Sequence, residues 1–203
     1  MIRIEDEGAL RRITIARPDK ANSLTGTMLG RLAQSVEDWS GSALVLSGEG
    51  RVFSAGADLD EVQAGTLATH PGWERLSGAI AAFPGLSVAA LNGTAAGGAL
   101  GMILACDLRL AVPGAAIFYP VMKMGVLPQP SDPARLAALV GPSRAALLLM
   151  AGVRVEAAEA LAWGLIDRIV EPEALDETAV ALCAPSLKAG ATRVAEIRSM
   201  IRD

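Results

Sequence analysis

The chain has 203 residues, of which 52% are hydrophobic and 20% charged, and its formal net charge is −4. A composition this apolar supports a large buried core and excludes an intrinsically disordered protein. The acidic balance and the aromatic content of 3% argue against a nucleic-acid partner. A multi-histidine metal site is excluded because His70 is the single histidine, so we expect no metal.

No apolar run reaches the roughly 18 residues that a membrane span needs. The first residues, MIRIEDEGALRR, lack the basic-then-apolar pattern of a signal peptide. Two cysteines, Cys106 and Cys183, are far apart and have no metal-ligand spacing. We therefore expect a cytoplasmic protein without a membrane span.

Strand and helix patterns alternate in the first half of the chain, and helix patterns dominate the second. Alternating apolar residues predict a strand at 12–16, and Thr25 is expected to cap the helix that follows. Continuous apolar runs predict buried strands at 42–48 and 86–91. This pattern indicates an α/β unit with parallel strands, followed by packed helices. The other predicted elements are helices at 72–83, 98–106, 131–140, 142–152, 154–164, 172–184 and 186–202, and strands at 108–112, 116–119 and 165–170.

A glycine-rich turn lies between a strand and a helix in residues 91–107, LNGTAAGGALGMILACD. Backbone N–H groups at such a turn favour an anion or a developing negative oxygen. Neither a P-loop nor a G-x-G-x-x-G pattern is present, and close helix packing would also explain the glycines. Residues 51–62, RVFSAGADLDEV, set a second small-residue loop between a strand and a helix. Two such loops on neighbouring strands could direct two N–H groups at one oxygen, as an oxyanion hole does.

Five stretches occur together in one order and spacing: RPDKANSLTGTML (17–29), ALVLSGEGRVFSAGADL (43–59), ALNGTAAGGALGMILACDLRLA (90–111), FYPVMKMGVLP (118–128) and AWGLIDRIV (162–170). In this combination the chain resembles the crotonase, or enoyl-CoA hydratase/isomerase, superfamily. The resemblance implies an α/β fold: a crotonase-like spiral of ββα units with a helical C-terminal region. It implies one domain over residues 1–203, with the spiral at 1–130 and the helices at 131–203.

The resemblance also implies an acyl-CoA or enoyl-CoA thioester as ligand, with no separate cofactor. By motif position, the N–H groups of Ala57 and Gly98 would hold the thioester oxygen, and one such donor is worth about 3–4 kcal/mol of barrier. Arg17 and Lys20 would lie near the coenzyme phosphates, or would be solvated surface charges. Asp58 is also expected to cap the helix behind its loop. The implied contacts with the coenzyme or the acyl group are Arg17, Lys20, Ala21, Leu24, Ala55, Asp58, Leu59, Gly97 and Val121.

The chain departs from the hydratase pattern where the family carries its two acid–base glutamates. Those positions hold Gly101 and Val121, which cannot exchange a proton. Because acid–base catalysis contributes about 10²–10⁴-fold, we expect little standard hydratase activity. Asp132 is the only carboxylate in the altered loop PQPSDP, and it is either a helix cap or a non-standard base. Gln129 stands where aroyl-CoA dehalogenases carry a nucleophilic aspartate, so dehalogenation is not expected.

Three functions remain open from the sequence. The first is an enzyme of enolate type that uses a non-standard base such as Asp132, or no base at all, and the second is a non-catalytic acyl-CoA binder or carrier. The third is a structural subunit with a vestigial pocket, against which the intact SAGAD loop argues. Tyr119 and Lys123 flank Val121 and either reach a substrate or simply pack or face solvent. The resemblance implies a homo-oligomer, a trimer in the family, although the chain is shorter at its C-terminus than typical relatives.

Overall fold

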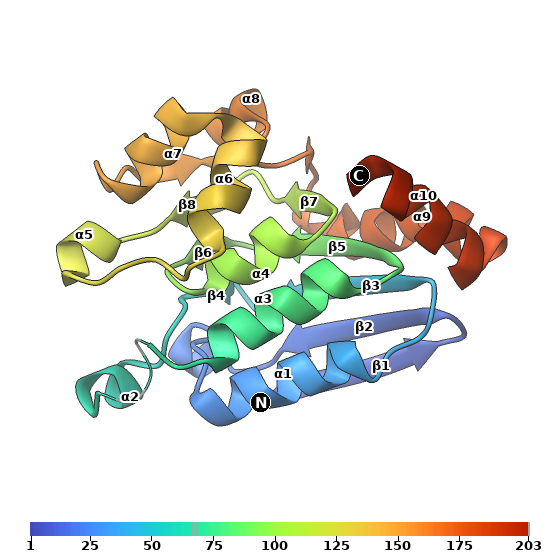
Figure 1. Ribbon diagram of the computed structural model, residues 1–203, viewed down its shortest axis with the longest axis horizontal. Helices are drawn as coiled ribbons and strands as arrows, with labels where there is room; N and C mark the ends of the chain where they lie inside the picture. Colours follow the sequence, from blue (N-terminus) through green and yellow to red (C-terminus); the bar gives the residue numbers. More distant parts are fainter. Residues whose placement is uncertain (66, 68, 203) are drawn as a thin grey trace.

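The computed structural model describes residues 1–65, 67 and 69–202, and its strands form two sheets (Figure 1). The larger sheet begins with an antiparallel hairpin, and its remaining pairs are parallel. Its strands, in spatial order, are β1 (Ile2–Glu7), β2 (Leu10–Ile15), β3 (Ala43–Gly48), β5 (Leu86–Leu91), β7 (Leu108–Ala111) and β10 (Arg168–Ile169). The smaller sheet has the order β4 (Val52–Ser54), β6 (Thr94–Ala96), β8 (Ala116–Phe118) and β9 (Val155–Glu156).

Successive turns of the chain build both sheets at once. The pairs β3–β4, β5–β6 and β7–β8 each place one strand in the larger sheet and the next strand in the smaller one. The helices that follow these pairs are α2 (Leu59–Gln63) and α3 (Gly72–Ala82), then α4 (Ala99–Ala105), then α5 (Val121–Met124). This arrangement confirms the predicted spiral of ββα units.

Both faces of the larger sheet are covered, which is why its central strands are continuous apolar runs. Helix α1 (Gly26–Glu37) lies in front of the hairpin strands in Figure 1, and α3 packs between α1 and α4. Helix α9 (Leu175–Ala189) packs against β3, β5 and β7. The remaining helices are α6 (Asp132–Val140), α7 (Pro142–Leu149), α8 (Ala157–Trp163) and α10 (Ala191–Arg202), with 3₁₀ turns at Pro18–Lys20 and Pro172–Ala174.

The predicted elements match the structure best where burial and capping agree. Thr25 caps α1 through a hydrogen bond from the Met28 amide, as predicted. The predicted helix break between residues 184 and 186 is wrong, because α9 continues through Pro185. Gly190, with φ +83°, ends the helix instead. A proline removes one helical hydrogen bond, and here packing of Ala179 and Cys183 into the core holds the helix around it.

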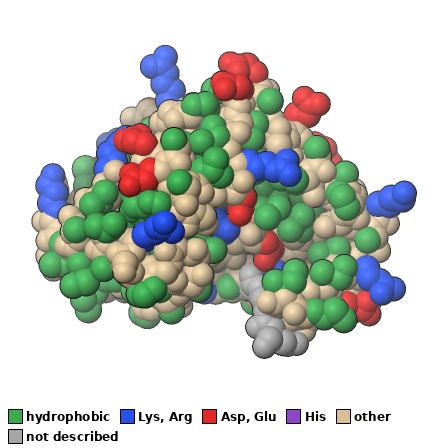
Figure 2. Space-filling model, turned by 90° about the horizontal axis from the view of Figure 1, so that it is seen from above, with side chains coloured by type: hydrophobic (Ala, Val, Ile, Leu, Met, Phe, Trp, Pro, Cys, Tyr) green, Lys and Arg blue, Asp and Glu red, His purple; other side chains and the backbone are tan. Residues whose placement is uncertain are grey.

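One cluster of buried apolar side chains extends from β1 to α9 and joins the two sheets to their helices. Figure 2 shows hydrophobic side chains scattered among charged ones on the face that it presents. Among the described residues, no helix is both long enough and apolar enough to cross a bilayer. The cluster includes Phe53 of β4, Ala95 of β6 and Ile117 of β8, so it holds the strands from whose ends the loops of interest begin.

Candidate functional site

Two small-residue loops meet where β4 and β6 end. These strands pair in parallel, so residues 55–58 and 97–98 leave the sheet at the same edge. Gly56 has φ +87°, and a Cβ placed on it would lie 2.7 Å from the Ala96 carbonyl oxygen and 3.1 Å from the Gly98 nitrogen. Only glycine permits this backbone conformation and this approach without strain. The glycine at 56 therefore brings the two loops into direct contact.

The amide groups of Ala57 and Gly98 make no hydrogen bond within the part of the chain that the structure describes. The surrounding amides, in contrast, have acceptors, which fixes the path of both loops. Backbone N–H groups are rarely left unpaired unless water or a ligand meets them. Two donors are thus available at the junction. The occupied amides donate as follows: Ala55 to the Ala21 carbonyl, Gly56 to Ser54 Oγ, Asp58 to the Leu24 carbonyl and Gly97 to the Phe118 carbonyl.

Both loops border one pocket of about 230 Å³. Trp73 lies directly beneath Gly98, since a Cβ on that glycine would approach the indole ring to 2.9 Å. At the mouth, the side chains of Leu59 and Leu127 are 68% and 87% exposed. The lining is largely apolar, so hydrogen bonds to the two amides would be made in a poorly solvated environment.

The pocket brings together six of the residues predicted for the site and leaves six outside its lining. The side chain of Leu24 is 0% exposed and packs in the core, while its backbone braces the loop at Ala57. Ala21 likewise acts through its carbonyl group, which accepts from Ala55. The lining residues are Ala55, Ala57, Leu59, Gly97, Gly98 and Val121, and the residues outside it are Arg17, Lys20, Ala21, Leu24, Asp58 and Asp132.

Arg17 is bound to the loop rather than free on the surface. Its Nη1 donates to Asp58 Oδ2 at 2.6 Å, and this hydrogen bond holds the pKa of the Asp58 carboxyl below its usual value. Asp58 caps α2 as predicted, accepting from the amides of Asp60 and Glu61. Lys20 is more peripheral, with Nζ 3.8 Å from the exposed carboxylate of Asp60. Arg17 therefore positions the loop that carries Ala57.

Replacing Arg17 with glutamine is expected to lower the free energy of unfolding by about 1.5–3 kcal/mol, because the buried Asp58 carboxylate loses its charged donor. The matched change Lys20→Gln removes an exposed pair and should cost under about 1 kcal/mol. Urea denaturation of both variants at pH 7 measures the difference. Equal losses in the two variants would contradict a structural role for Arg17.

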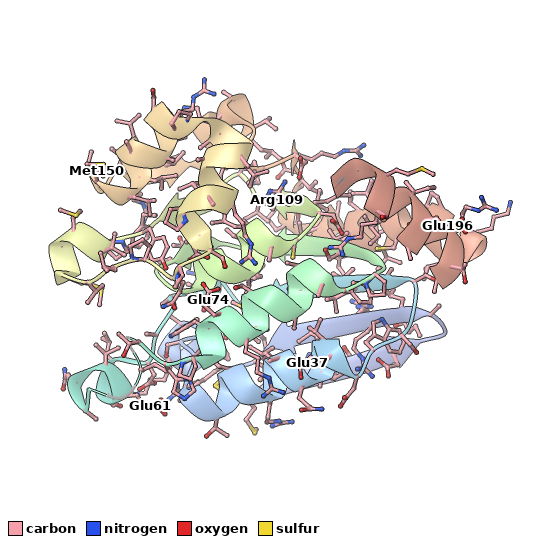
Figure 3. All side chains as sticks on the ribbon, viewed as in Figure 1. Glu37, Glu61, Glu74, Arg109, Met150 and Glu196 are labelled. Atoms are coloured by element: carbon pink, nitrogen blue, oxygen red, sulfur yellow. The ribbon has the colours of Figure 1, made fainter. Side chains whose placement is uncertain are left out.

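A buried carboxylate fills the space beside Gly101. A Cβ placed on Gly101 would lie 3.1 Å from Asp132 Oδ1, and the Asp132 side chain is 0% exposed. The prediction that Asp132 caps a helix is wrong, because Asp132 is the first residue within α6; Ser131 occupies the N-cap position and makes no side-chain capping hydrogen bond. Ser131 is held by Glu74 of α3, which Figure 3 labels. The Glu74 carboxylate accepts from the Ser131 amide at 3.0 Å and from the Ser131 hydroxyl at 2.6 Å.

Asp132 is connected to the pocket through Tyr119. The phenol donates to Asp132 Oδ2 at 2.9 Å and accepts from the backbone N–H of Gln129 at 3.2 Å. Asp132 Oδ1 has no hydrogen-bond partner among the described residues. Burial raises the pKa of Asp132 to about 6, against the lowering effect of the Tyr119 hydrogen bond, and burial also raises the pKa of Tyr119. The Asp132 carboxyl group thus has a pKa near neutrality. It does not border the pocket itself, and Tyr119 lies between the two.

Three parts of this arrangement were not predicted from the sequence. Trp73 forms the floor under Gly98, and Glu74 anchors the start of α6, but both lie in an ordinary amphipathic helix pattern. For Tyr119 the sequence allows either packing or a direct role. The useful signal was Gly101, because a glycine inside a buried helix leaves space for a side chain from elsewhere.

Comparisons with known proteins identify the family of the chain. The description "Enoyl-CoA hydratase/isomerase" belongs to the family whose sequence profile matches residues 5–203. A protein of Rhizobium meliloti named "Probable enoyl-CoA hydratase" is 33% identical over 87% of this chain and 71% of its own length. A 4-chlorobenzoyl coenzyme A dehalogenase of Arthrobacter is 34% identical over 83% of this chain and 65% of its own length.

Solved structures show the same fold. An enoyl-CoA hydratase subunit I from Geobacillus kaustophilus superposes with a TM-score of 0.89 at 31% identity, covering 99% of this chain and 80% of that one. DspI of Pseudomonas aeruginosa gives a TM-score of 0.90 at 32% identity, covering 99% of this chain and 86% of that one. Sequence, fold and the pair of meeting loops therefore lead to one conclusion: the chain belongs to the enoyl-CoA hydratase/isomerase family of the crotonase superfamily.

Proposed function

We propose that this protein binds an acyl-CoA thioester with the thioester oxygen between the N–H groups of Ala57 and Gly98. The observation that carries the proposal is that these two amides donate no hydrogen bond to any described residue and border the same apolar pocket. Membership of the family supports the choice of ligand. Two preorganised donors polarise a carbonyl group and stabilise the enolate formed when a proton leaves the adjacent carbon.

The size of the pocket favours the acyl end of such a ligand. Its volume of about 230 Å³ is below the roughly 300–1,000 Å³ that encloses a drug-sized molecule. The coenzyme would therefore extend past the exposed side chain of Leu59, on the side where Lys20 and Asp60 lie. This placement gives Lys20 a long-range electrostatic role toward phosphate groups, while Arg17 remains with Asp58.

A non-catalytic acyl-CoA binder is the second candidate. It is favoured by Gly101 and Val121, which put no proton-exchanging side chain at the two positions where hydratases of this family carry glutamate. The same absence argues against water addition as the activity. Gln129 borders the pocket, and an amide is a poor nucleophile, which argues against the dehalogenation named for the Arthrobacter relatives.

Isotope-edited infrared spectroscopy with crotonyl-CoA labelled with ¹³C at the carbonyl tests the proposal. We expect calorimetric binding of crotonyl-CoA, stronger than that of free coenzyme A, with a lowered carbonyl stretching frequency in the complex. Binding without a frequency shift would contradict the two-amide site, and no binding would contradict the ligand. Hydration of crotonyl-CoA at the rate of an ordinary hydratase would contradict the role assigned to Gly101 and Val121.

A further inference from the structure

We propose that Tyr119 and Asp132 form the acid–base pair of this site, replacing the glutamate that is absent at Gly101. Tyr119 is the catalytic residue that meets the ligand, and Asp132 is the positioning residue that holds the transferred proton behind it. The inference rests on the proposed function, because it requires an acyl-CoA whose thioester oxygen lies at the Ala57 and Gly98 amides.

Position is the first argument. Gly101 lies three residues after Gly98 in chain order, so the two share a face over about one helical turn. The carboxylate of Asp132 fills the space where a side chain at 101 would begin, with Oδ1 3.1 Å from the Cβ position. The acidic group of Asp132 thus lies beside the residue one helical turn after the amide that would hold the thioester oxygen. It arrives there from α6 rather than from α4.

Access is the second argument. Asp132 is fully buried and does not border the pocket, whereas Tyr119 does. The phenolic Oη connects the two, because it donates to Asp132 Oδ2 and accepts from the Gln129 amide. The Gln129 amide fixes one lone pair of the phenol and the carboxylate fixes its proton. The second lone pair of the oxygen is left to meet a ligand atom.

The electrostatic surroundings of Asp132 are the third argument. Glu74 of α3 acts to raise the pKa of Asp132, while Tyr119 and Arg135 act to lower it, and burial outweighs both. One oxygen of Asp132 and the Nη1 of Arg135 are buried without a partner in the described chain. A carboxylate satisfied on one oxygen alone is costly as a purely structural group. Such costs are concentrated at functional sites.

The pair supports one balanced proton transfer. The bond between the acyl α-carbon and its hydrogen breaks, and its electron pair forms the enolate whose oxygen the Ala57 and Gly98 amides hold. The proton passes to Tyr119 Oη as the phenolic proton moves to Asp132 Oδ2. The products are an enolate, a neutral phenol and a neutral Asp132. Reversal in D₂O returns deuterium to the α-carbon, and no other reactant is consumed.

Proton NMR of butyryl-CoA in D₂O measures this exchange. We expect the wild-type protein to exchange the α-hydrogens, and Tyr119→Phe and Asp132→Asn to slow the exchange about 100-fold. Binding of butyryl-CoA by calorimetry should stay within about threefold for both variants. Lys123→Gln, an exposed change two residues from Val121, is the matched control and should leave exchange unchanged.

The pH profile separates proton transfer from a merely structural role. Because Asp132 must be charged to accept a proton, wild-type exchange should rise about tenfold per pH unit and level off above its pKa of about 6. The residual exchange of Asp132→Asn should lack that inflection. Binding without exchange, or exchange retained in both variants, would overturn the acid–base pair and leave the proposed function standing. Absence of butyryl-CoA binding in the wild type would overturn the proposed function itself.

Discussion

Replacing Gly56 with alanine is expected to weaken butyryl-CoA binding about tenfold or more, through loss of a hydrogen bond to the thioester oxygen. The added Cβ would lie 2.7 Å from the Ala96 carbonyl oxygen and 3.1 Å from the Gly98 nitrogen. The two loops must then separate, and the amides of Ala57 and Gly98 no longer converge on one atom. Calorimetry measures the affinity, and the carbonyl stretching frequency of bound ligand should return toward its value in water.

A matched variant separates the steric effect of the new Cβ at position 56 from general backbone strain. Gly152 also has a positive φ, +67°, but a Cβ placed on it meets nothing within 4 Å. Alanine at either position carries the cost of a left-handed conformation, about 1–2 kcal/mol. Gly152→Ala should therefore lose stability and keep its affinity, measured well below the unfolding transition. If both variants bind butyryl-CoA as tightly as the wild type, the contact between the two loops does not set the ligand site.

The prediction of the fold from sequence succeeded where local pattern and burial agree. β5 was predicted at residues 86–91 and is observed there, because both faces of that strand are buried and its apolar run is continuous. β1 was missed, since five of its six residues are exposed and its charges resemble a loop. The strands β6 and β9 were not predicted, because they have three and two residues and are too short for a period to be read.

The candidate site was predictable only as far as its loops. The two loops could be located from their glycines, because few residues other than glycine tolerate a positive φ or a close approach of another backbone segment. The partner of Arg17 could not be predicted, because Arg17 and Asp58 are 41 positions apart in the sequence. The contact between Gly101 and Asp132 likewise depends on how α6 crosses α4, which periodicity does not specify. Tertiary contacts decide which charges face a ligand and which hold the fold.

Placing glutamate at Gly101 tests whether the carboxyl group of Asp132 occupies the space of a side chain at position 101. Gly101→Glu alone is expected to lower the free energy of unfolding by about 3 kcal/mol, because the new side chain is overpacked and sets a second carboxyl group against Asp132. Gly114 offers a matched control, since it is exposed and a Cβ there meets nothing within 4 Å. Gly114→Glu should therefore stay within about 0.5 kcal/mol of the wild type.

The double variant Gly101→Glu with Asp132→Ala measures how strongly the two positions are coupled in the free energy of unfolding. Asp132→Ala alone leaves the Tyr119 hydroxyl without its acceptor, at a cost of about 1–3 kcal/mol. If the two acids compete for one space, the double variant should be more stable than the sum of the single losses by about 2 kcal/mol. The new glutamate then gains both the vacated volume and the phenol as its donor. Additive losses in urea denaturation would mean that Asp132 does not stand in the place of a side chain at 101.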